Sequence, residues 1–350
     1  MIQGKKTATD IVGIYIILLS FSLTVYSQAE TVKMQPVLRL MFYNVENFFD
    51  TDNDPLTNDD EYTPEGKRYW SVGRYINKRN NIFKVIANVG EWEPPSLISL
   101  CEIENRKVLE GLIRNTPLTK YQYGIIHKDS PDQRGIDVAL IYRKDLLRPV
   151  RQQFIPYPDR RRRTRDILFV TLLTQNKDTL HLFINHWPSR SGGQKKSEPA
   201  RILTASILRQ KVDSIFARNA NANIVITGDL NDEPLDKSII SGLKAKPDIS
   251  KTAPSALYNL TALKMKEKTG TIKYQGRWLV YDQMIVSGAM LKPGNKLETG
   301  LKKCTIFRAD YLLEPDKRYS GTKPFRTYSG LKYNKGFSDH LPVVLDITLN

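Results

Sequence analysis

The sequence predicts a mixed α/β or α+β fold, in which two β-sheets pack together and helices cover their outer faces. Short apolar runs, typical of buried strands, recur along the 350-residue chain and outnumber the stretches with helical spacing. Several of these runs follow one another with no helix between them. A purely parallel, doubly wound sheet needs a crossover helix after nearly every strand, so the pattern favours a sandwich.

The strand predictions rest on apolar runs bounded by polar or turn residues. In chain order they cover residues 37–45, 96–103, 137–143, 167–174, 180–186, 222–230, 277–287 and 341–349. Residues 75–89, 105–114 and 200–216 are predicted as helices instead. In the first helix, Ile82, Val85 and Ile86 share an apolar face, and Lys78 and Lys84 lie on the opposite face.

The N-terminus differs in character from the body of the chain. Lys5 and Lys6 precede an uncharged, largely apolar stretch from Ile11 to Val25, and small residues follow it. This pattern predicts a signal peptide over residues 1–29, although the stretch is nearly long enough to be an uncleaved membrane anchor. We therefore expect an exported protein, periplasmic or extracellular, with one domain over residues 36–350 that no repeat or linker divides.

Composition narrows the range of partners. The chain has 53 Lys and Arg against 37 Asp and Glu, a net charge of +16 that would attract nucleic acid or an anionic membrane. Two basic clusters are candidates for substrate contact, the Arg160–Arg163 run and the group of Lys195, Lys196 and Arg201. Such clusters are also common on solvated faces. The two cysteines, at positions 101 and 304, exclude a disulfide framework and a Cys-rich zinc module.

Polar side chains interrupt or end the apolar runs at five places. These are residues 44–47, 102–105, 228–231, 281–282 and 338–340. One such residue alone is usually a turn or a cap. A buried carboxylate, however, needs a cation, a donor or a metal beside it. Five such places together predict a site at the strand ends, where ligand sites of α/β proteins usually lie.

The spacing within these segments suggests roles for the side chains. Asp229 and Asn231 would emerge on one face of an extended backbone, whereas Asp339 and His340 would point to opposite sides. His340 therefore needs another carboxylate to orient it, and Asp282 is the best candidate. A lone histidine is usually structural, and we expect this of His127 and His181. His186 differs because Trp187 and Pro188 follow it, which would end the strand and expose its ring. Oxygen-rich ligands favour Mg²⁺, Mn²⁺ or Ca²⁺ over zinc.

Seven motifs in order resemble the endonuclease/exonuclease/phosphatase superfamily, which includes deoxyribonucleases, sphingomyelinases and inositol polyphosphate phosphatases. They are NVENFFD (44–50), EIEN (102–105), RGIDVALIY (134–142), NHWPSR (185–190), GDLND (228–232), YDQMIVS (281–287) and SDHLPVV (338–344). The resemblance covers nearly the whole chain after residue 36. It implies a four-layered sandwich of two mixed β-sheets flanked by helices, and a divalent-metal-dependent phosphoesterase.

The resemblance also implies roles for individual residues. The implied metal-site residues are Glu102, Asn44 and Asp339. The implied catalytic residues are His340, His186, Asp229, Asp282 and Asn231, with Asp282 orienting His340 and Asn231 bonding a phosphate oxygen. Asp137 would support His186, and Arg134 and Arg165 are weaker candidates for substrate binding or support.

The resemblance leaves the substrate open. Net positive charge and the NVENFFD segment favour a secreted nuclease, whose partner would be nucleic acid. The alternatives are a phosphatase or phosphodiesterase acting on a phosphorylated small molecule, and a sphingomyelinase-like enzyme acting on a phospholipid. A catalytically silent binding protein is a further alternative, although each expected position holds a competent residue type.

Overall fold

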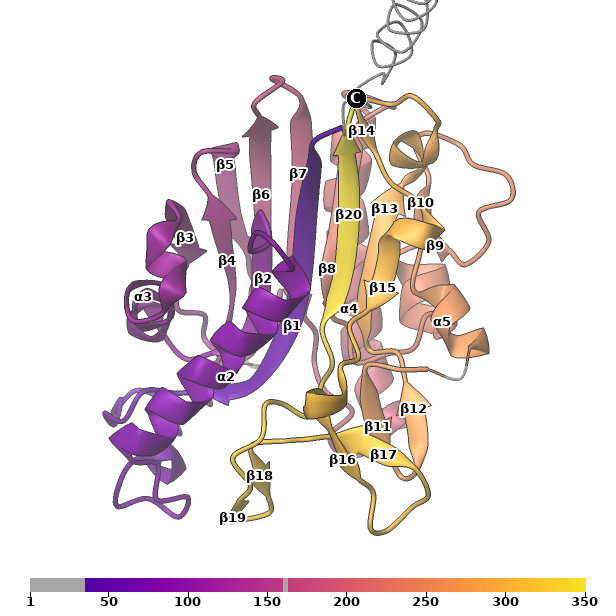
Figure 1. Cartoon of the computed structure of the whole chain (residues 1–350). Coiled ribbons are helices and arrows are strands. Elements are labelled where there is room, and N and C mark those ends of the chain that lie inside the picture. Colours follow the sequence, from indigo (N-terminus) through magenta and orange to yellow (C-terminus); the bar gives the residue numbers. More distant parts are fainter. Residues whose placement is uncertain (1–34, 160–162, 268) are drawn as a thin grey trace, which may run out of the picture. The chain divides into compact units, whose positions relative to one another are not determined.

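Two seven-stranded β-sheets form the centre of the computed structural model, which describes residues 35–159, 163–267 and 269–350 (Figure 1). Residues 36–350 form one compact unit. The predicted signal peptide and the arginines at 160–162 lie outside the described residues. In the described part of the chain, no helix combines the length and the apolar character needed to cross a membrane.

Sheet A has the strand order β14-β20-β1-β2-β4-β3, and β15 pairs with β20. Its strands are β1 (Val37–Phe48), β2 (Leu97–Ile103), β3 (Tyr123–His127), β4 (Asp137–Arg143), β14 (Leu297–Glu298), β15 (Cys304–Ile306) and β20 (Val343–Leu349). Sheet B has the order β5-β6-β7-β8-β13-β10-β9. Its strands are β5 (Leu147–Ile155), β6 (Ile167–Thr174), β7 (Thr179–His186), β8 (Asn223–Asp229), β9 (Ala245–Lys246), β10 (Leu257–Asn259) and β13 (Asp282–Ser287).

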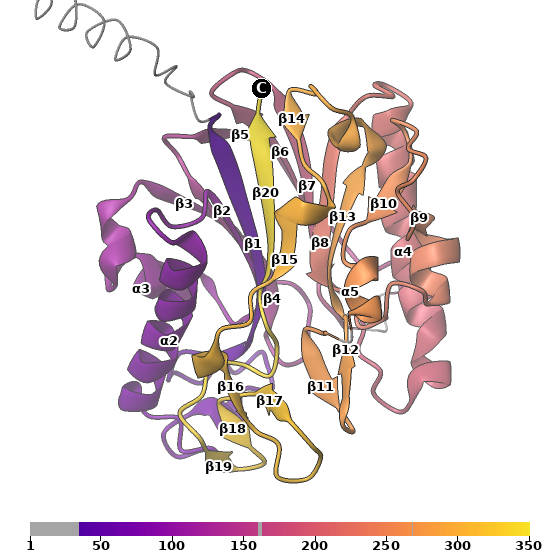
Figure 2. The same cartoon turned by 45° about the vertical axis from the view of Figure 1, so that its right-hand side comes forward.

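Three short hairpins lie at one end of the sheets (Figures 1 and 2). They are β11–β12 (Ile272–Tyr274 and Arg277–Leu279), β16–β17 (Leu313–Pro315 and Thr322–Pro324) and β18–β19 (Tyr328–Ser329 and Lys332–Tyr333). The α-helices are α2 (Val72–Gly90), α3 (Arg106–Arg114), α4 (Gln194–Phe216) and α5 (Ala262–Lys266). Short helical turns occur at Asp60–Tyr62, Pro117–Lys120, Ser238–Gly242, Gly288–Leu291, Leu301–Lys303 and Asp310–Leu312.

Successive side chains of each strand face opposite sides of the sheet, so each sheet packs against the other sheet on one side and against helices on the other. In β1, Leu40 and Phe42 join the core between the two sheets, whereas Met41 and Tyr43 join a second core beneath α2 and α3. In sheet B, a third core packs beneath α4, so the layers run α2/α3, sheet A, sheet B, α4 (Figure 2). This arrangement confirms the predicted sandwich. Cys101 is a buried thiol between the sheets, as expected.

The structure corrects several details of the sequence prediction. Lys78 is buried, and its Nζ donates to Thr327 Oγ1 and to the Phe337 carbonyl at 2.5 and 2.6 Å, because the C-terminal hairpins cover that face of α2. Arg201 is also fully buried, so it is no surface residue for substrate. The single strand predicted over 277–287 is two strands, β12 and β13, which belong to different sheets.

Candidate active site

The polar residues at the strand ends meet at one edge of the sandwich. In several strands, the row of alternate side chains that faces the core between the sheets ends at this edge. Asn44 ends the inward stripe of β1, and Asp229 ends that of β8 in the opposite sheet. The parallel pairing of β7 with β8 sets His186 beside Asp229, and the antiparallel pairing of β8 with β13 sets Asp282 opposite Asp229. The strand registers therefore gather these four residues.

Asp229 is the centre of the cluster. Its Oδ2 atom accepts a hydrogen bond from Asn44 Nδ2 at 3.1 Å. The same oxygen lies 3.7 Å from His186 Nε2 and 3.8 Å from His340 Nε2. Burial raises the pKa of Asp229, while the neighbouring His340 opposes that rise. Two histidines from opposite sheets thus direct the same ring atom toward one buried carboxylate.

His340 and Asp282 form the dyad predicted from the sequence. The distance between His340 Nδ1 and Asp282 Oδ2 is 2.6 Å, and both residues are buried. Burial alone would lower the pKa of His340, but the negative charges of Asp282 and Asp229 outweigh it and raise that pKa well above its ordinary value. The His340 backbone is held by the Ser338 hydroxyl, which itself donates to the Asn44 carbonyl at 2.7 Å.

His186 lies in the opposite electrostatic situation. Burial lowers its pKa well below the ordinary value, and the positive charges of Arg165 and Arg134 lower it further. Arg165 is buried, with Nη1 donating to Asp132 at 3.0 Å and Nη2 to the Trp187 carbonyl at 2.7 Å. Arg134 is half exposed and pairs with the same Asp132 at 3.8 Å. The two arginines therefore act on His186 through charge, and in the described part of the chain neither is hydrogen-bonded to its ring.

The sequence predicted that Asp137 supports His186, and the structure contradicts this. Asp137 shares the helix-covered face of β4 with Ala139 and Ile141, whereas His186 continues the inter-sheet stripe of β7. The Asp137 carboxylate lies 3.4 Å from His127 Nε2 instead. Among the described residues His186 Nδ1 has no hydrogen-bond partner. Strand alternation thus places Asp137 on the helix-covered face of sheet A and His186 on the inter-sheet face of sheet B.

Asn231 lies beside Asp229, with its side chain already in use. Its backbone N–H donates to Asp229 Oδ1 at 3.0 Å, and its Nδ2 donates to the Trp187 carbonyl at 3.0 Å. A φ of 51° lets the chain turn sharply after Asp229, a conformation that asparagine tolerates better than most residues. The second N–H of this carboxamide is the donor that a phosphate oxygen would use.

Glu102 reaches the site through a β-bulge. The register of β2 against β4 shifts between Cys101 and Ile103, and Glu102 has a φ of 62°. Its Oε2 accepts a hydrogen bond from the Asn47 backbone N–H at 2.9 Å, and its Oε1 lies 4.0 Å from His186 Nε2. One carboxylate oxygen of Glu102 is therefore fixed, and the other faces the site.

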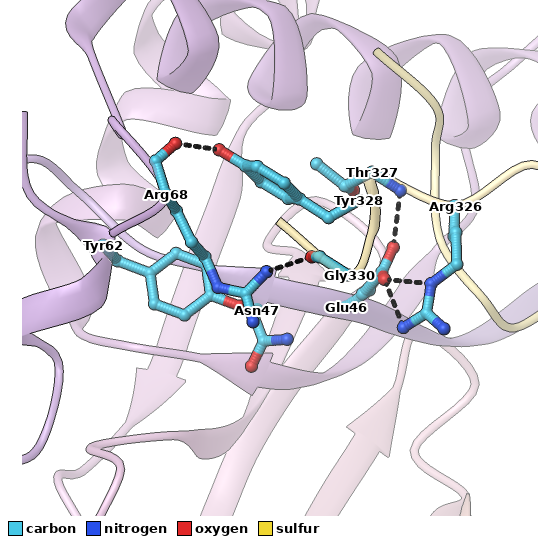
Figure 3. Close-up of a pocket in the computed structure, with 8 residues that line it drawn as sticks. All are labelled: Glu46, Asn47, Tyr62, Arg68, Arg326, Thr327, Tyr328 and Gly330. Atoms are coloured by element: carbon cyan, nitrogen blue, oxygen red, sulfur yellow. Dashed lines mark hydrogen bonds and ion pairs between the residues drawn. The ribbon is translucent and has the colours of Figure 1, made fainter. Parts of the chain in front are cut away.

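Asp339 is engaged by an arginine that the sequence analysis missed. Arg326 Nη2 donates to Asp339 Oδ2 at 3.0 Å, and Arg326 also bonds the buried Glu46 at 2.8 and 2.9 Å (Figure 3). Burial raises the pKa of Glu46, and the nearby Asp339 adds to this rise. Arg326 and Glu46 are 280 positions apart, so no local pattern could reveal their pairing.

The donor set fits a hard divalent cation. Its members are carboxylates and a carboxamide, from Glu102, Asp339, Asp229, Asp282 and Asn44, and oxygen ligands suit Mg²⁺, Mn²⁺ or Ca²⁺. Ligand atoms of Asp229, Asp282 and His340 lie within 4.8 Å of one another. The Oδ1 atom of Asp282 is buried and has no hydrogen-bond partner in the described part of the chain. Such an unsatisfied anionic atom is consistent with a nearby cation.

Comparisons with solved structures agree with this fold at low sequence identity. A humanized zebrafish (D. rerio) TDP2 matches with a TM-score of 0.55 and 14% identity over 89% of this chain and 99% of that one. The human Nocturnin catalytic domain matches with a TM-score of 0.54 and 15% identity, over 91% and 97%. A mannosyl-6-phosphatase of Bacteroides thetaiotaomicron matches with 0.53 and 15%, over 89% and 100%. No curated protein matches the chain.

The sequence itself matches the profile of the endonuclease/exonuclease/phosphatase family over residues 39–349. This match spans both sheets and every segment that contributes to the cluster around Asp229. Members of the family are divalent-metal-dependent hydrolases of phosphate esters. The chain belongs to the endonuclease/exonuclease/phosphatase family.

Proposed function

We propose that this chain is an exported, Mg²⁺-dependent nuclease that hydrolyses phosphodiester bonds by in-line attack of water. The observation that carries the proposal is the convergence on Asp229. His186 and His340 approach its Oδ2 atom from opposite sheets at 3.7 and 3.8 Å. A phosphate placed over this carboxylate would contact both imidazoles at once.

The two histidines would play different parts because their surroundings differ. The raised pKa of His340 keeps its ring protonated, so it can donate a proton or a charged hydrogen bond to the phosphoryl group. The lowered pKa of His186 keeps that ring neutral. Asp229, buried and poised between them, is the group best placed to accept a proton from water.

Glu102, Asn44 and Asp339 would hold the metal ion, with Mg²⁺ the expected ion and Mn²⁺ or Ca²⁺ the alternatives. When bound, a hard cation neutralises charge that develops on the phosphoryl oxygens. Asp339 would then exchange or share its present partner Arg326. His186 and Asn231 would bind the non-bridging oxygens from the other side.

Positive charge supports a nucleic-acid substrate. The chain carries a net charge of +16, and a polyanion binds by displacing counterions with Lys and Arg. A structurally similar D. rerio TDP2 was solved in complex with a single-strand DNA product. A phosphorylated small molecule is the second candidate, because one structural relative is a mannosyl-6-phosphatase. The segment 311–335 is polar and rich in Tyr and Lys, which does not favour insertion into a lipid bilayer.

A comparison of three substrate classes tests the proposal. Plasmid nicking, phosphate release from sugar or inositol phosphates, and sphingomyelin cleavage would be measured with one enzyme preparation in Mg²⁺, Mn²⁺ and Ca²⁺. The proposal expects nicking to be the fastest of the three. Absence of nicking with every ion, together with phosphate release from a small molecule, would overturn the nuclease in favour of the phosphatase. Absence of all three would favour a binding protein.

Export is a separate part of the proposal. It rests on Lys5, Lys6 and the uncharged stretch from Ile11 to Val25. Cell fractionation and N-terminal sequencing of the mature protein would test it. A mature protein outside the cytoplasm that begins after Ser27 or Ala29 would support a cleaved signal peptide. A full-length protein in the membrane fraction would indicate an anchor, and a cytoplasmic protein would contradict export.

A further inference from the structure

A pocket of about 250 Å³ lies beside the candidate active site, and the sequence analysis named none of its side chains as site residues (Figure 3). Its lining includes Asn47, Tyr62, Arg68, Arg326 and Tyr328. Asn47 comes from the end of β1, Tyr62 and Arg68 from the segment between β1 and α2, and Arg326 and Tyr328 from the β17–β18 region. The pocket is thus assembled where the two ends of the domain sequence meet.

Two walls of the pocket are hydrogen-bonded to candidate metal ligands. The Asn47 backbone donates to Glu102 Oε2 at 2.9 Å, and Arg326 Nη2 donates to Asp339 Oδ2 at 3.0 Å. A substrate phosphate held by Glu102 and Asp339 through a metal would therefore have this pocket as its neighbour. The next charged group of the same substrate could enter it.

Arg68 is fixed in place before any ligand arrives. Its guanidinium lies 5.0 Å from the ring centre of Tyr62 and 5.1 Å from that of Tyr328. It pairs with Glu61 at 3.1 Å, and one terminal nitrogen donates to the Gly330 carbonyl at 3.1 Å (Figure 3). Within the described part of the chain, its Nη2 atom has no bond partner. A pre-ordered guanidinium loses little entropy when it binds an oxyanion.

The remaining polar groups of the pocket are also donors. Arg326 uses Nε and Nη2 for Glu46 and Asp339, which leaves its Nη1 without a partner among the described residues. The Asn47 carboxamide has no partner in the same part of the chain. The one carboxylate in the lining, Glu46, already accepts from Arg326 and from the Thr327 N–H at 2.7 Å. Two guanidinium groups and an amide with free N–H groups are suited to an oxyanion such as phosphate.

The aromatic rings of the pocket do not offer a platform for a nucleobase. Tyr62 stacks on Phe49 at 4.3 Å between ring centres and also contacts Arg68. Tyr328 contacts Arg68 and packs 5.3 Å from the ring of Tyr333. The rings therefore hold the arginine, and the pocket itself selects for charge.

The pocket continues into a longer basic groove. Arg326 also lines a second pocket of about 200 Å³, which contains Asp339, Lys273 and Lys323. Gln275 is shared between that pocket and a third of about 630 Å³ that includes Arg190, Arg277 and the exposed Tyr274. A small phosphorylated molecule would fill one pocket only. Arginines and lysines outnumber carboxylates in the first two pockets, whereas the third also contains Glu233 and Asp236. A row of adjoining pockets with two basic members and an exposed aromatic ring suits a strand of nucleic acid.

We propose that the pocket around Arg68 binds the phosphate that adjoins the scissile phosphodiester of a nucleic-acid strand. The inference rests on the proposed nuclease activity and adds a subsite to it. The enzyme would then recognise two consecutive phosphates, one at the cluster around Asp229 and one between Arg68, Arg326 and Asn47. A substrate with an isolated phosphodiester would gain nothing from this pocket.

The test adds one phosphate to a minimal substrate. Wild-type kcat/KM would be measured for a dinucleotide with a single phosphodiester and for the same dinucleotide with a terminal phosphate at the 5′ or the 3′ end. One of the two phosphorylated forms is expected to gain at least about tenfold, the size of a charged hydrogen bond. In Arg68→Ala this gain should fall below about threefold.

A second variant and a control guard against misfolding. Asn47→Gly removes the carboxamide but keeps the backbone N–H to Glu102, and glycine accepts the φ of 55° at this position. Asn47→Gly should also reduce the increase in kcat/KM that the terminal phosphate produces. Arg143→Ala is the matched control. Like Arg68, Arg143 lies over a tyrosine ring, at 4.9 Å from the ring centre of Tyr121, and pairs with a carboxylate, that of Asp145. It stands at the end of β4 that is remote from the candidate active site. Arg143→Ala should keep the full gain, and melting temperatures would be recorded for all three variants.

The outcomes separate this inference from the nuclease proposal. If the wild type cleaves nucleic acid but neither terminal phosphate raises kcat/KM, the subsite is wrong and the nuclease stands. The subsite is also wrong if Arg68→Ala keeps the gain, or if it slows bis-p-nitrophenyl phosphate as much as the phosphorylated dinucleotide. If the wild type hydrolyses bis-p-nitrophenyl phosphate but no nucleic acid, both proposals fall. A gain seen only with bisphosphorylated sugars would overturn the subsite in favour of a small-molecule site.

Discussion

At the scale of single residues, the two histidines beside Asp229 differ in charge although they point at the same oxygen. The negative charges of Asp282 and Asp229 raise the pKa of His340, whereas burial, aided by the positive charges of Arg165 and Arg134, lowers the pKa of His186. Paired groups whose pKa values are pushed in opposite directions are typical of acid–base chemistry. The different roles proposed for the two histidines therefore follow from burial and from the charges of their neighbours.

Replacing either histidine should abolish most turnover without unfolding the protein. His340→Ala and His186→Ala are each expected to lower kcat by about 10²–10⁴-fold, the usual contribution of a general acid or base. Hydrolysis of bis-p-nitrophenyl phosphate at saturating metal measures the loss. His181→Ala is the control, because His181 lies within β7 away from the cluster and should leave kcat within about threefold. Wild-type rates in both active-site variants would refute the assignment.

His181 itself should make stability depend on pH. Burial, helped by the charge of Arg151, lowers the pKa of His181 to about 4. The unfolded chain binds a proton at this ring near pH 6.5 and the folded protein does not, so stability falls as the pH drops from about 6.5 toward 4. The loss from this ring is at most about 3 kcal/mol. Urea unfolding at pH 7 and at pH 4.5 measures it, and His181→Gln should show a smaller pH dependence than the wild type.

Some site residues could be predicted from the sequence and others could not. Asp229 and Asp282 stand at the ends of apolar runs, where alternation alone directs them to the inter-sheet face. His340 precedes β20, so its place depends on the path of the chain before that strand. The same alternation directs Asp137 away from His186, and the motif match overrode it in the prediction. Arg326 escaped notice because it lies outside the motifs, and its pairing with Glu46 of the NVENFFD segment joins residues 280 positions apart.

At the scale of elements, a buried ion pair holds the loop that follows β8. Arg201 of α4 is fully buried and its Nε lies 2.8 Å from Asp232 Oδ2. Asp232 also binds Arg190 at 2.9 Å, and Arg190 donates to the Asn231 carbonyl at 2.8 Å. Through Arg201 and Asp232, α4 therefore helps to hold the backbone of the GDLND segment in place. Its role is positioning, which explains why this basic residue does not face the surface.

Arg201→Ala should destabilise the protein by about 3 kcal/mol, the low end for breaking a buried ion pair, because Arg190 would remain as a partner of Asp232. Arg209→Ala on the same helix is the matched control, since Arg209 pairs with the exposed Asp213 one turn away. Its cost should stay within about 0.5 kcal/mol. Guanidinium unfolding of both variants measures the difference. Equal stabilities would show that the buried pair contributes nothing beyond an exposed one.

The sequence predicted the long elements better than the short ones. The inner strands β1, β2, β7 and β8 are continuous apolar runs, so their positions were clear. β5 was missed because it is a partly exposed edge strand with arginines, glutamines and a register shift after Pro149. The hairpins that build the groove are short and polar, and only their contacts with the rest of the fold define them.

At the scale of the whole molecule, two sheets pack face to face, and the core-facing side chains of both sheets end at the same edge of the sandwich. Apolar side chains fill the stripes up to that edge, and polar ones replace them where the core ends. The three hairpins β11–β12, β16–β17 and β18–β19 then extend this edge into adjoining pockets, whose lining includes Arg326, Lys273 and Arg277. The net positive charge of the chain favours binding of a polyanion, and the subsite proposed around Arg68 is where one of its phosphates would bind.

Removal of the metal ion tests the central claim most directly. Hydrolysis of bis-p-nitrophenyl phosphate would be followed for the wild type in Mg²⁺, after EDTA and after re-addition of Mg²⁺, with Glu102→Gln in parallel. We expect activity to vanish in EDTA, to return with the metal, and to fall by at least about 10²-fold in Glu102→Gln while the protein remains folded. Turnover that persists in EDTA, or a Glu102→Gln variant with the wild-type rate, would contradict a metal-dependent phosphodiesterase centre at this edge of the sandwich.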